Sequence, residues 1–238
     1  MNTNESSLET GSIGRNWKVI GIVAFFAAGL VASGLLRFFH LHTEDPVALS
    51  AYATEIYIGL TILAAVLLRR SGVPFKRLGF GVACQPAKYL ALAAAGVGLI
   101  QLSGWLLEPL WEHIFGGTRD LARFSDVAGS PVALAKLMAL NWTFAAFGEE
   151  LAFRIILMRS IAFALGDSRK AFAVALILQA VIFGLVHAYQ GPAGVFGAAI
   201  NGLIFGGLTL AARGSIWPAA ITHGSSNSTG IMAMYLSG

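Results

Sequence analysis

The segment "AFAVALILQAVIFGLVH" (171–187) carries no charged residue, and it opens a long apolar region of the chain. From Ala171 to Gly238 the only Lys, Arg, Asp or Glu residue is Arg213. A helix that crosses a bilayer needs roughly 20 apolar residues, so this region is long enough for about three crossings. The predicted fold class is therefore all-α, a polytopic bundle of transmembrane helices.

The composition of the whole chain supports the same fold class. Of its 238 residues, 56% are hydrophobic and 12% are charged, whereas a soluble domain is about one quarter charged. The net charge of +4 comes from residues beside the apolar stretches, which is typical of the positive-inside bias and does not require a nucleic-acid partner. With Cys84 as the single cysteine, the chain can form neither an internal disulfide nor a cysteine metal cluster.

We predict about seven spans, with eight as the alternative count. Residues 1–129 hold about three of these helices with their loops, and residues 130–238 hold the others. The predicted spans are 17–37, 51–68, 88–107, 131–165, 171–188, 193–212 and 215–236.

The charges between the spans predict an orientation. The segment 69–88 holds five basic residues and no acidic residue, so we expect it on the cytoplasmic side. Arg169 and Lys170 follow two spans later and should share that side.

The predicted helix 131–165 is unusually long. Ser130 and Pro131 are typical of a helix start, with proline at the first helical position, and Gly166 is typical of a helix end. Thirty-five residues would run about 52 Å at 1.5 Å each, while the bilayer core is about 30 Å thick. We therefore expect this helix to tilt, protrude or break, with Gly148 as its weakest point.

Three charges follow directly after Gly148, in the segment "FGEELAFR" (147–154). Glu150 and Arg154 are spaced i and i+4, so they can pair on one helix face. That pairing would offset much of the cost of placing both charges in a membrane. Glu149 is left without a local partner, which makes it a candidate functional group. The structural alternative is an interfacial salt-bridge cluster.

Two further polar groups interrupt the apolar helices. The segment "FGLVH" (183–187) ends at His187, one turn after Phe183, and "HGSSN" (223–227) places His223 and Asn227 on one helix face. Each group alone also fits a structural alternative, a hydrogen-bonded histidine at a helix end or a polar contact between helices.

The spacing predicts that these groups meet. Glu149 lies 19 residues before Ser168, the centre of the turn "GDSRK", and His187 lies 19 residues after it. In an antiparallel helix pair, equal distances from the turn give equal depth. His223 lies near the middle of the last span, so it and Asn227 are expected at the same cavity.

The side chains expected at this cavity are of the types needed to hydrolyse an amide bond. A carboxylate beside a histidine can hold and deprotonate a water molecule, and a histidine with an asparagine can donate hydrogen bonds to an oxyanion. A zinc ion is the alternative, because Glu149, His187 and His223 match the three protein ligands of a catalytic zinc site. The sequence lacks an H-E-x-x-H helix, and we expect either no cofactor or zinc.

In this order, "EELAFR" (149–154), "FGLVH" and "HGSSN" resemble the motifs of the CPBP family of intramembrane proteases, the CAAX prenyl endopeptidase and bacteriocin-processing (Abi-like) group. The resemblance covers about residues 130–238 and implies that they form the catalytic core. It implies a general base at Glu149 and a water-positioning partner at His187. It also implies an oxyanion-stabilising pair, His223 and Asn227.

The remaining motif residues, Glu150, Arg154 and Phe183, are implied to be supporting. The resemblance leaves open a metalloprotease-like and a metal-free, glutamate-type mechanism. It implies a multi-pass protein of the plasma membrane of a bacterium, acting on a membrane-associated peptide or a lipidated, CAAX-type tail. It does not predict an oligomeric state.

The predicted function is therefore an intramembrane endopeptidase. One alternative is a proton-coupled transporter, since buried Glu, His and Arg residues also form proton relays. Another is a non-catalytic scaffold with the family's fold. The expected orientation places the site toward the outer half of the membrane, whereas prenylated tails are cytoplasmic. Either the number of spans is miscounted or the substrate is not a cytoplasmic prenylated tail.

Overall fold

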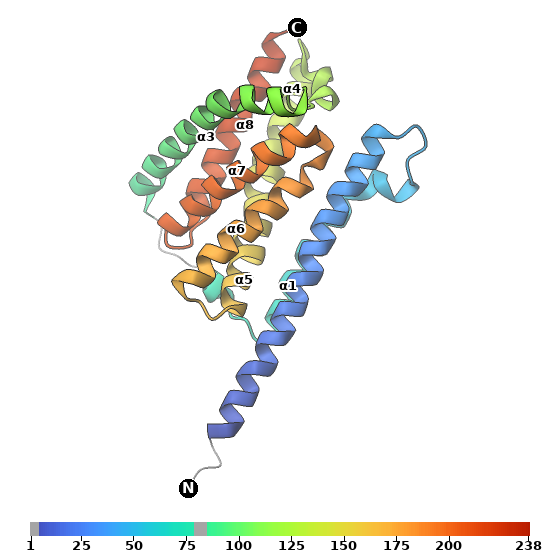
Figure 1. Ribbon diagram of the computed structural model, residues 1–238. Coiled ribbons are helices and arrows are strands. Elements are labelled where there is room, and N and C mark those ends of the chain that lie inside the picture. The colour runs from blue at the N-terminus through green and yellow to red at the C-terminus, as the bar shows by residue number, and fades with distance from the viewer. Residues whose placement is uncertain (1–4, 79–84) are drawn as a thin grey trace.

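The computed structural model describes residues 5–78 and 85–238, and within these ranges the chain is helical without any strand. The predicted all-α fold class is confirmed. Figure 1 shows a bundle in which long helices run roughly side by side. The α-helices are α1 (Glu5–His42), α2 (Ala53–Arg70), α3 (Pro86–Phe115), α4 (Pro131–Leu140), α5 (Arg159–Ala164), α6 (Arg169–Val186), α7 (Gly191–Ala211) and α8 (Trp217–Leu236).

Shorter helical segments connect these elements. Two are π-helical, η4 (Asn141–Glu149) and η5 (Leu151–Met158), and both lie between α4 and α5. The 3-10 segments are η1 (Ala48–Tyr52), η2 (Phe75–Leu78), η3 (Ala122–Val127) and η6 (Ala188–Gln190).

In the described part of the chain, five helical stretches are long and apolar enough to cross a membrane. They coincide with five of the seven predicted spans. The predicted spans 131–165 and 215–236 are also helical, but they are not among the five. The first is divided between α-helical and π-helical segments, and the second carries the polar group "HGSSN". The five stretches are Trp17–His42, Ala48–Arg70, Pro86–Phe115, Arg169–Val186 and Ala188–Ala211.

The predicted long helix starts where its sequence signals place it, but it does not break. Ser130 caps α4, because its side chain accepts a hydrogen bond from the N–H group of Ala133 at 3.3 Å, and Pro131 opens the first turn. The expected weak point, Gly148, lies inside η4. Glu150, between the two π segments, keeps helical angles of φ −63° and ψ −37°. Widened π turns keep the backbone hydrogen-bonded, which an open break among apolar side chains would not.

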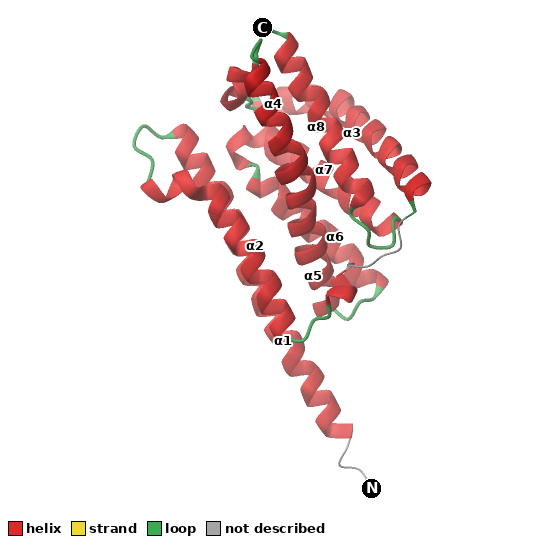
Figure 2. Cartoon of the chain, turned by 180° about the vertical axis from the view of Figure 1, so that it is seen from behind, coloured by secondary structure: helices red, strands yellow, loops and turns green. Residues whose placement is uncertain are grey.

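The helices pack in a way that brings the N-terminal and C-terminal parts together. Helices α1 and α2 lie side by side along one edge of the bundle (Figure 2), and α3 lies against α7 and α8. Helix α1 approaches the end of α6 closely, since a Cβ atom on Gly34 would lie 2.7 Å from the Cα atom of Val186. The bundle therefore has no separate N-terminal unit.

The two ends of the bundle carry different loops. At one end the side chain of Lys88 donates to the carbonyl of Ala211 at 2.9 Å, which joins the start of α3 to the end of α7. At the other end the N–H group of Asp120 donates to the carbonyl of Gln190 at 3.1 Å. His187 follows α6 at this second end, away from Arg169 at the helix start.

Candidate active site

One cavity of about 770 Å³ is lined by all four predicted site residues. Glu149 is the last residue of η4, and His187 directly follows α6. His223 and Asn227 both belong to α8. The helices thus bring together side chains that are up to 78 positions apart in the sequence. Their catalytic roles remain predictions.

The hydrogen bonding of His187 fixes its tautomer. Its Nδ1 atom lies 2.7 Å from the carbonyl oxygen of Phe183, one turn earlier. Because a carbonyl can only accept, the proton must be on Nδ1, and Nε2 of the neutral ring is left as an acceptor. The ring of Phe183 packs against the imidazole with a centroid distance of 4.6 Å. His187 can therefore accept a proton or a hydrogen bond through Nε2.

Glu149 is half-buried and has no ion-pair partner among the described residues. Its Oε2 atom is buried, and no described group forms a hydrogen bond with it. A carboxylate oxygen without a hydrogen bond or an ion pair can accept a proton from water. This is the environment that the predicted general base requires.

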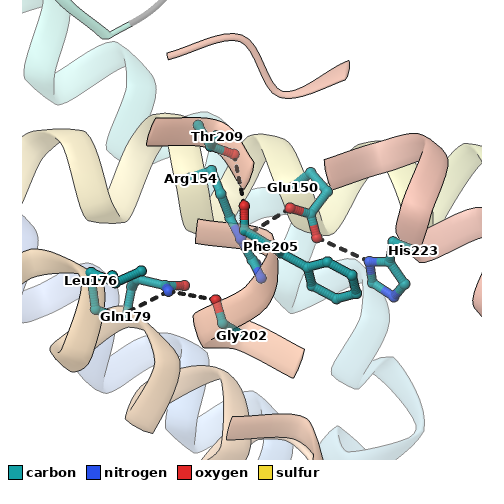
Figure 3. A network of polar contacts seen from close by, with 8 residues as sticks. All are labelled: Glu150, Arg154, Leu176, Gln179, Gly202, Phe205, Thr209 and His223. Atoms are coloured by element: carbon teal, nitrogen blue, oxygen red, sulfur yellow. Dashed lines mark hydrogen bonds and ion pairs between the residues drawn. The ribbon is translucent and has the colours of Figure 1, made fainter. Parts of the chain in front are cut away.

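Glu150 has the opposite environment, because it is fully buried between two partners. One oxygen, Oε2, lies 3.0 Å from Nε of Arg154, so the predicted i, i+4 ion pair is confirmed. The other, Oε1, lies 3.0 Å from Nδ1 of His223. Figure 3 shows Glu150 between the two side chains, with the second ring nitrogen of His223 on the far side of the imidazole. The carboxylate accepts from Nδ1–H, so His223 can donate through Nε2 only as the imidazolium.

Arg154 is surrounded by aromatic rings. Its Cζ atom lies 4.7 Å from the ring centre of Phe183, 5.1 Å from that of Phe205 and 5.7 Å from that of Phe153. Ring faces attract a cation, so they help to stabilise a fully buried guanidinium whose Nη atoms have no hydrogen bond within the described residues. The charge of Arg154 in turn stabilises Glu150, and Glu150 orients His223.

Two polar residues of this region were missed by the sequence reasoning. Asn141 in η4 lines the cavity and donates through Nδ2 to the carbonyl of Gly224 at 2.9 Å and to Oγ of Ser228 at 3.2 Å. It ties η4 to α8. Gln179 in α6 donates to the carbonyl of Gly202 in α7 at 2.8 Å (Figure 3). A lone amide within an apolar segment was the signal for both.

The expected zinc alternative requires three ligand side chains that converge on one point. Within residues 5–78 and 85–238, no group of three or more His, Cys, Asp or Glu side chains is placed to hold a metal ion. Glu149, His187 and His223 share the cavity but do not form a ligand set.

A comparison with protein families matches this part of the chain. Residues 131–229 match the family described as type II CAAX prenyl endopeptidase Rce1-like. The resemblance to the CPBP intramembrane proteases is thus confirmed, and the match together with the apolar helices supports an integral membrane protein of the CAAX-type protease class. The match lies within the predicted catalytic core and covers less than half of the chain.

The matched segment contains Glu149, His187, His223 and Asn227, and it gives no support to the transporter alternative. Comparisons with curated proteins and with solved structures gave no match.

Proposed function

We propose that the protein is an endopeptidase in which Glu149 and His187 activate a water molecule within the membrane-embedded cavity. The observation that carries this proposal is that a carboxylate without an ion pair and an imidazole with a free acceptor nitrogen line the same cavity. Together these groups can hold a water molecule and take its proton. The family match supports peptide hydrolysis as the reaction class.

The proposed reaction begins when the water loses a proton to Glu149 and its oxygen attacks the scissile carbonyl carbon. The carbonyl oxygen becomes an oxyanion, which accepts hydrogen bonds from the Asn227 amide and from Nε2–H of the His223 imidazolium. When the C–N bond breaks, the proton held by Glu149 passes to the leaving nitrogen. The products are a new carboxyl group and a new amine.

The cavity also supports a role for Glu150 and Arg154 behind the reacting groups. Glu150 is in contact with His223 and not with the cavity, whose lining residues do not include it. It accepts from Nδ1–H of His223 and so orients the ring with Nε2 away from Glu150. Phe183 holds His187 through its carbonyl and Arg154 through its ring.

We propose a membrane-associated peptide or a lipidated, CAAX-type tail as the substrate. The family match supports a substrate of this class. The position of the cavity between apolar helices supports it as well, because a lipid-anchored peptide is held beside those helices.

The test is cleavage of a lipidated peptide, and of the same peptide without its lipid, by the purified protein in detergent. We expect Glu149→Gln and His187→Ala each to lower kcat by about 10²- to 10⁴-fold, the usual contribution of general acid–base catalysis. We also expect the lipidated peptide to be cleaved faster than the bare one.

Two neighbouring residues provide matched controls. Glu112 and His113 are exposed in α3 and do not line the cavity, so Glu112→Gln and His113→Ala should cleave at the wild-type rate. Near-wild-type turnover by both site variants would contradict the mechanism.

A further inference from the structure

A second, much smaller cavity lies behind Glu149. Its volume is about 10 Å³, which is close to the least that holds one water molecule. Residues of α1 and α2 form part of its wall, although both helices lie outside the matched family segment. The lining residues are Ser33, Gly34, Arg37, Tyr57, Phe144, Glu149 and Val186.

Two residues that line this cavity each have a buried polar atom without a hydrogen-bond partner among the described residues. These atoms are Oη of Tyr57 and Oε2 of Glu149. Tyr57 is only 7% exposed, and its ring packs against Phe144 with a centroid distance of 5.9 Å. A buried hydroxyl and a buried carboxylate oxygen that both lack partners would be costly. An ordered water molecule is a common partner for such groups.

A third polar group completes the surroundings. Ser33 is buried at the same cavity, and its hydroxyl donates to the carbonyl of Leu30 at 2.7 Å. The Ser33 oxygen therefore keeps lone pairs with which it can accept. The site offers a hydroxyl donor, Tyr57, a guanidinium donor, Arg37, and two acceptors, Glu149 and Ser33. A buried water molecule usually makes two to four hydrogen bonds.

We propose that a water molecule binds in this cavity and bridges Tyr57 and Glu149. The water accepts a hydrogen bond from Oη–H of Tyr57 and donates to Oε2 of Glu149, which holds the carboxylate with Oε1 toward the large cavity. Tyr57 is thus a positioning residue that acts on the proposed general base from α2. Only the effect on catalysis rests on the proposed function, since the water bridge itself does not require any activity.

The test depends on the groups that surround Glu149, because each of them influences its titration. Seven titratable side chains lie around it. They are Arg37 of α1, Tyr57 of α2, Arg123 of η3, Glu150 beside it, Arg154 of η5, His187 after α6 and His223 of α8. The Tyr57→Phe substitution leaves the other groups in place and removes one hydroxyl.

The first measurement is an infrared titration of the Glu149 carboxyl group, whose band is identified by its loss in Glu149→Gln. In Tyr57→Phe the protonation midpoint should rise by about one pH unit, because the charged carboxylate loses a hydrogen-bond network that favours it. Tyr52→Phe is the control, since Tyr52 is exposed in η1 and lines neither cavity.

The second measurement is the pH profile of peptide cleavage by the same variants. In Tyr57→Phe, kcat should fall about tenfold with KM unchanged, and the acidic limb of the profile should move to higher pH by the same amount as the infrared midpoint. A merely structural role for Tyr57 would lower kcat without moving this limb.

The third measurement is thermal unfolding. If the hydroxyl is bonded to a water molecule, Tyr57→Phe should leave Tm unchanged or lower it, whereas removing a truly unbonded hydroxyl should raise Tm. An unchanged infrared midpoint or a raised Tm overturns the proposal. If the wild-type protein cleaves no peptide, the proposed function fails, and the infrared titration and Tm still decide whether the water bridge exists.

Discussion

Glu149 and Glu150 are neighbours in the sequence with different surroundings. Glu150 lies between Arg154 and His223, while no described side chain forms a hydrogen bond with Oε2 of Glu149. The i, i+4 rule predicted the Glu150–Arg154 pair because it is a local property of one helix. It could not predict the contact between Glu150 and His223, which are 73 positions apart. That contact depends on how α8 packs against the preceding helices.

At the residue scale, we predict that Glu150→Gln destabilises the protein strongly. It leaves the buried charge of Arg154 without its partner, and such a loss typically costs 3–5 kcal/mol. Unfolding of the purified protein by heat or denaturant measures the change. Cleavage should also fall, because His223 loses the carboxylate that orients its ring.

A double variant separates these two effects. Glu150→Gln combined with Arg154→Met removes both buried charges, so most of the stability should return, while cleavage should stay low. A double variant with wild-type cleavage would show that Glu150 has no function beyond neutralising Arg154.

At the scale of the elements, the ends of the helix that begins at Pro131 were predictable and its interior was not. The Ser130 cap is a local signal, and so is Gly166, where the chain has a positive φ of 90°. The π turns of η4 and η5 depend on the packing around them, so a single sequence does not reveal them. The sequence predicted a weak point at Gly148, and there the structure has a continuous, widened helix.

The close approach of α1 to α6 gives a prediction at this scale. A Cβ atom on Gly34 would lie 2.7 Å from backbone atoms of Val186, the residue before His187. We expect Gly34→Ala to lower stability by about 1–3 kcal/mol, as overpacking does, and to lower kcat by displacing His187. Thermal unfolding and the cleavage assay measure the two effects.

Gly21 in the same helix is the matched control, because no atom lies within 4 Å of the position that its Cβ would take. Gly21→Ala should be neutral, or more stable by up to about 1 kcal/mol through helix propensity. If the two variants behave alike, the contact between α1 and α6 does not position His187.

At the scale of the whole molecule, the predicted site is built from both parts of the chain. The large cavity is lined by Arg37 of α1 and Glu108 of α3 as well as by residues of the matched segment. Composition predicted that residues 1–129 form membrane helices. It carried no information on which of their side chains face the site, because that depends on contacts between distant segments.

The orientation in the membrane also belongs to this scale. His187 lies at the end of the bundle opposite the basic residues Arg169 and Lys170 that open α6. The positive-inside bias still predicts that the site faces the outer half of the membrane.

The central claim is that a water molecule held by Glu149 and His187 attacks the scissile carbonyl. It is tested most directly by a single turnover of a peptide substrate in ¹⁸O-labelled water, followed by mass spectrometry of the N-terminal product. We predict that the new carboxyl group of this product carries one ¹⁸O atom and that Glu149→Gln forms almost no product. A product without ¹⁸O in the first turnover would contradict the claim, because its new oxygen would then come from a side chain of the protein.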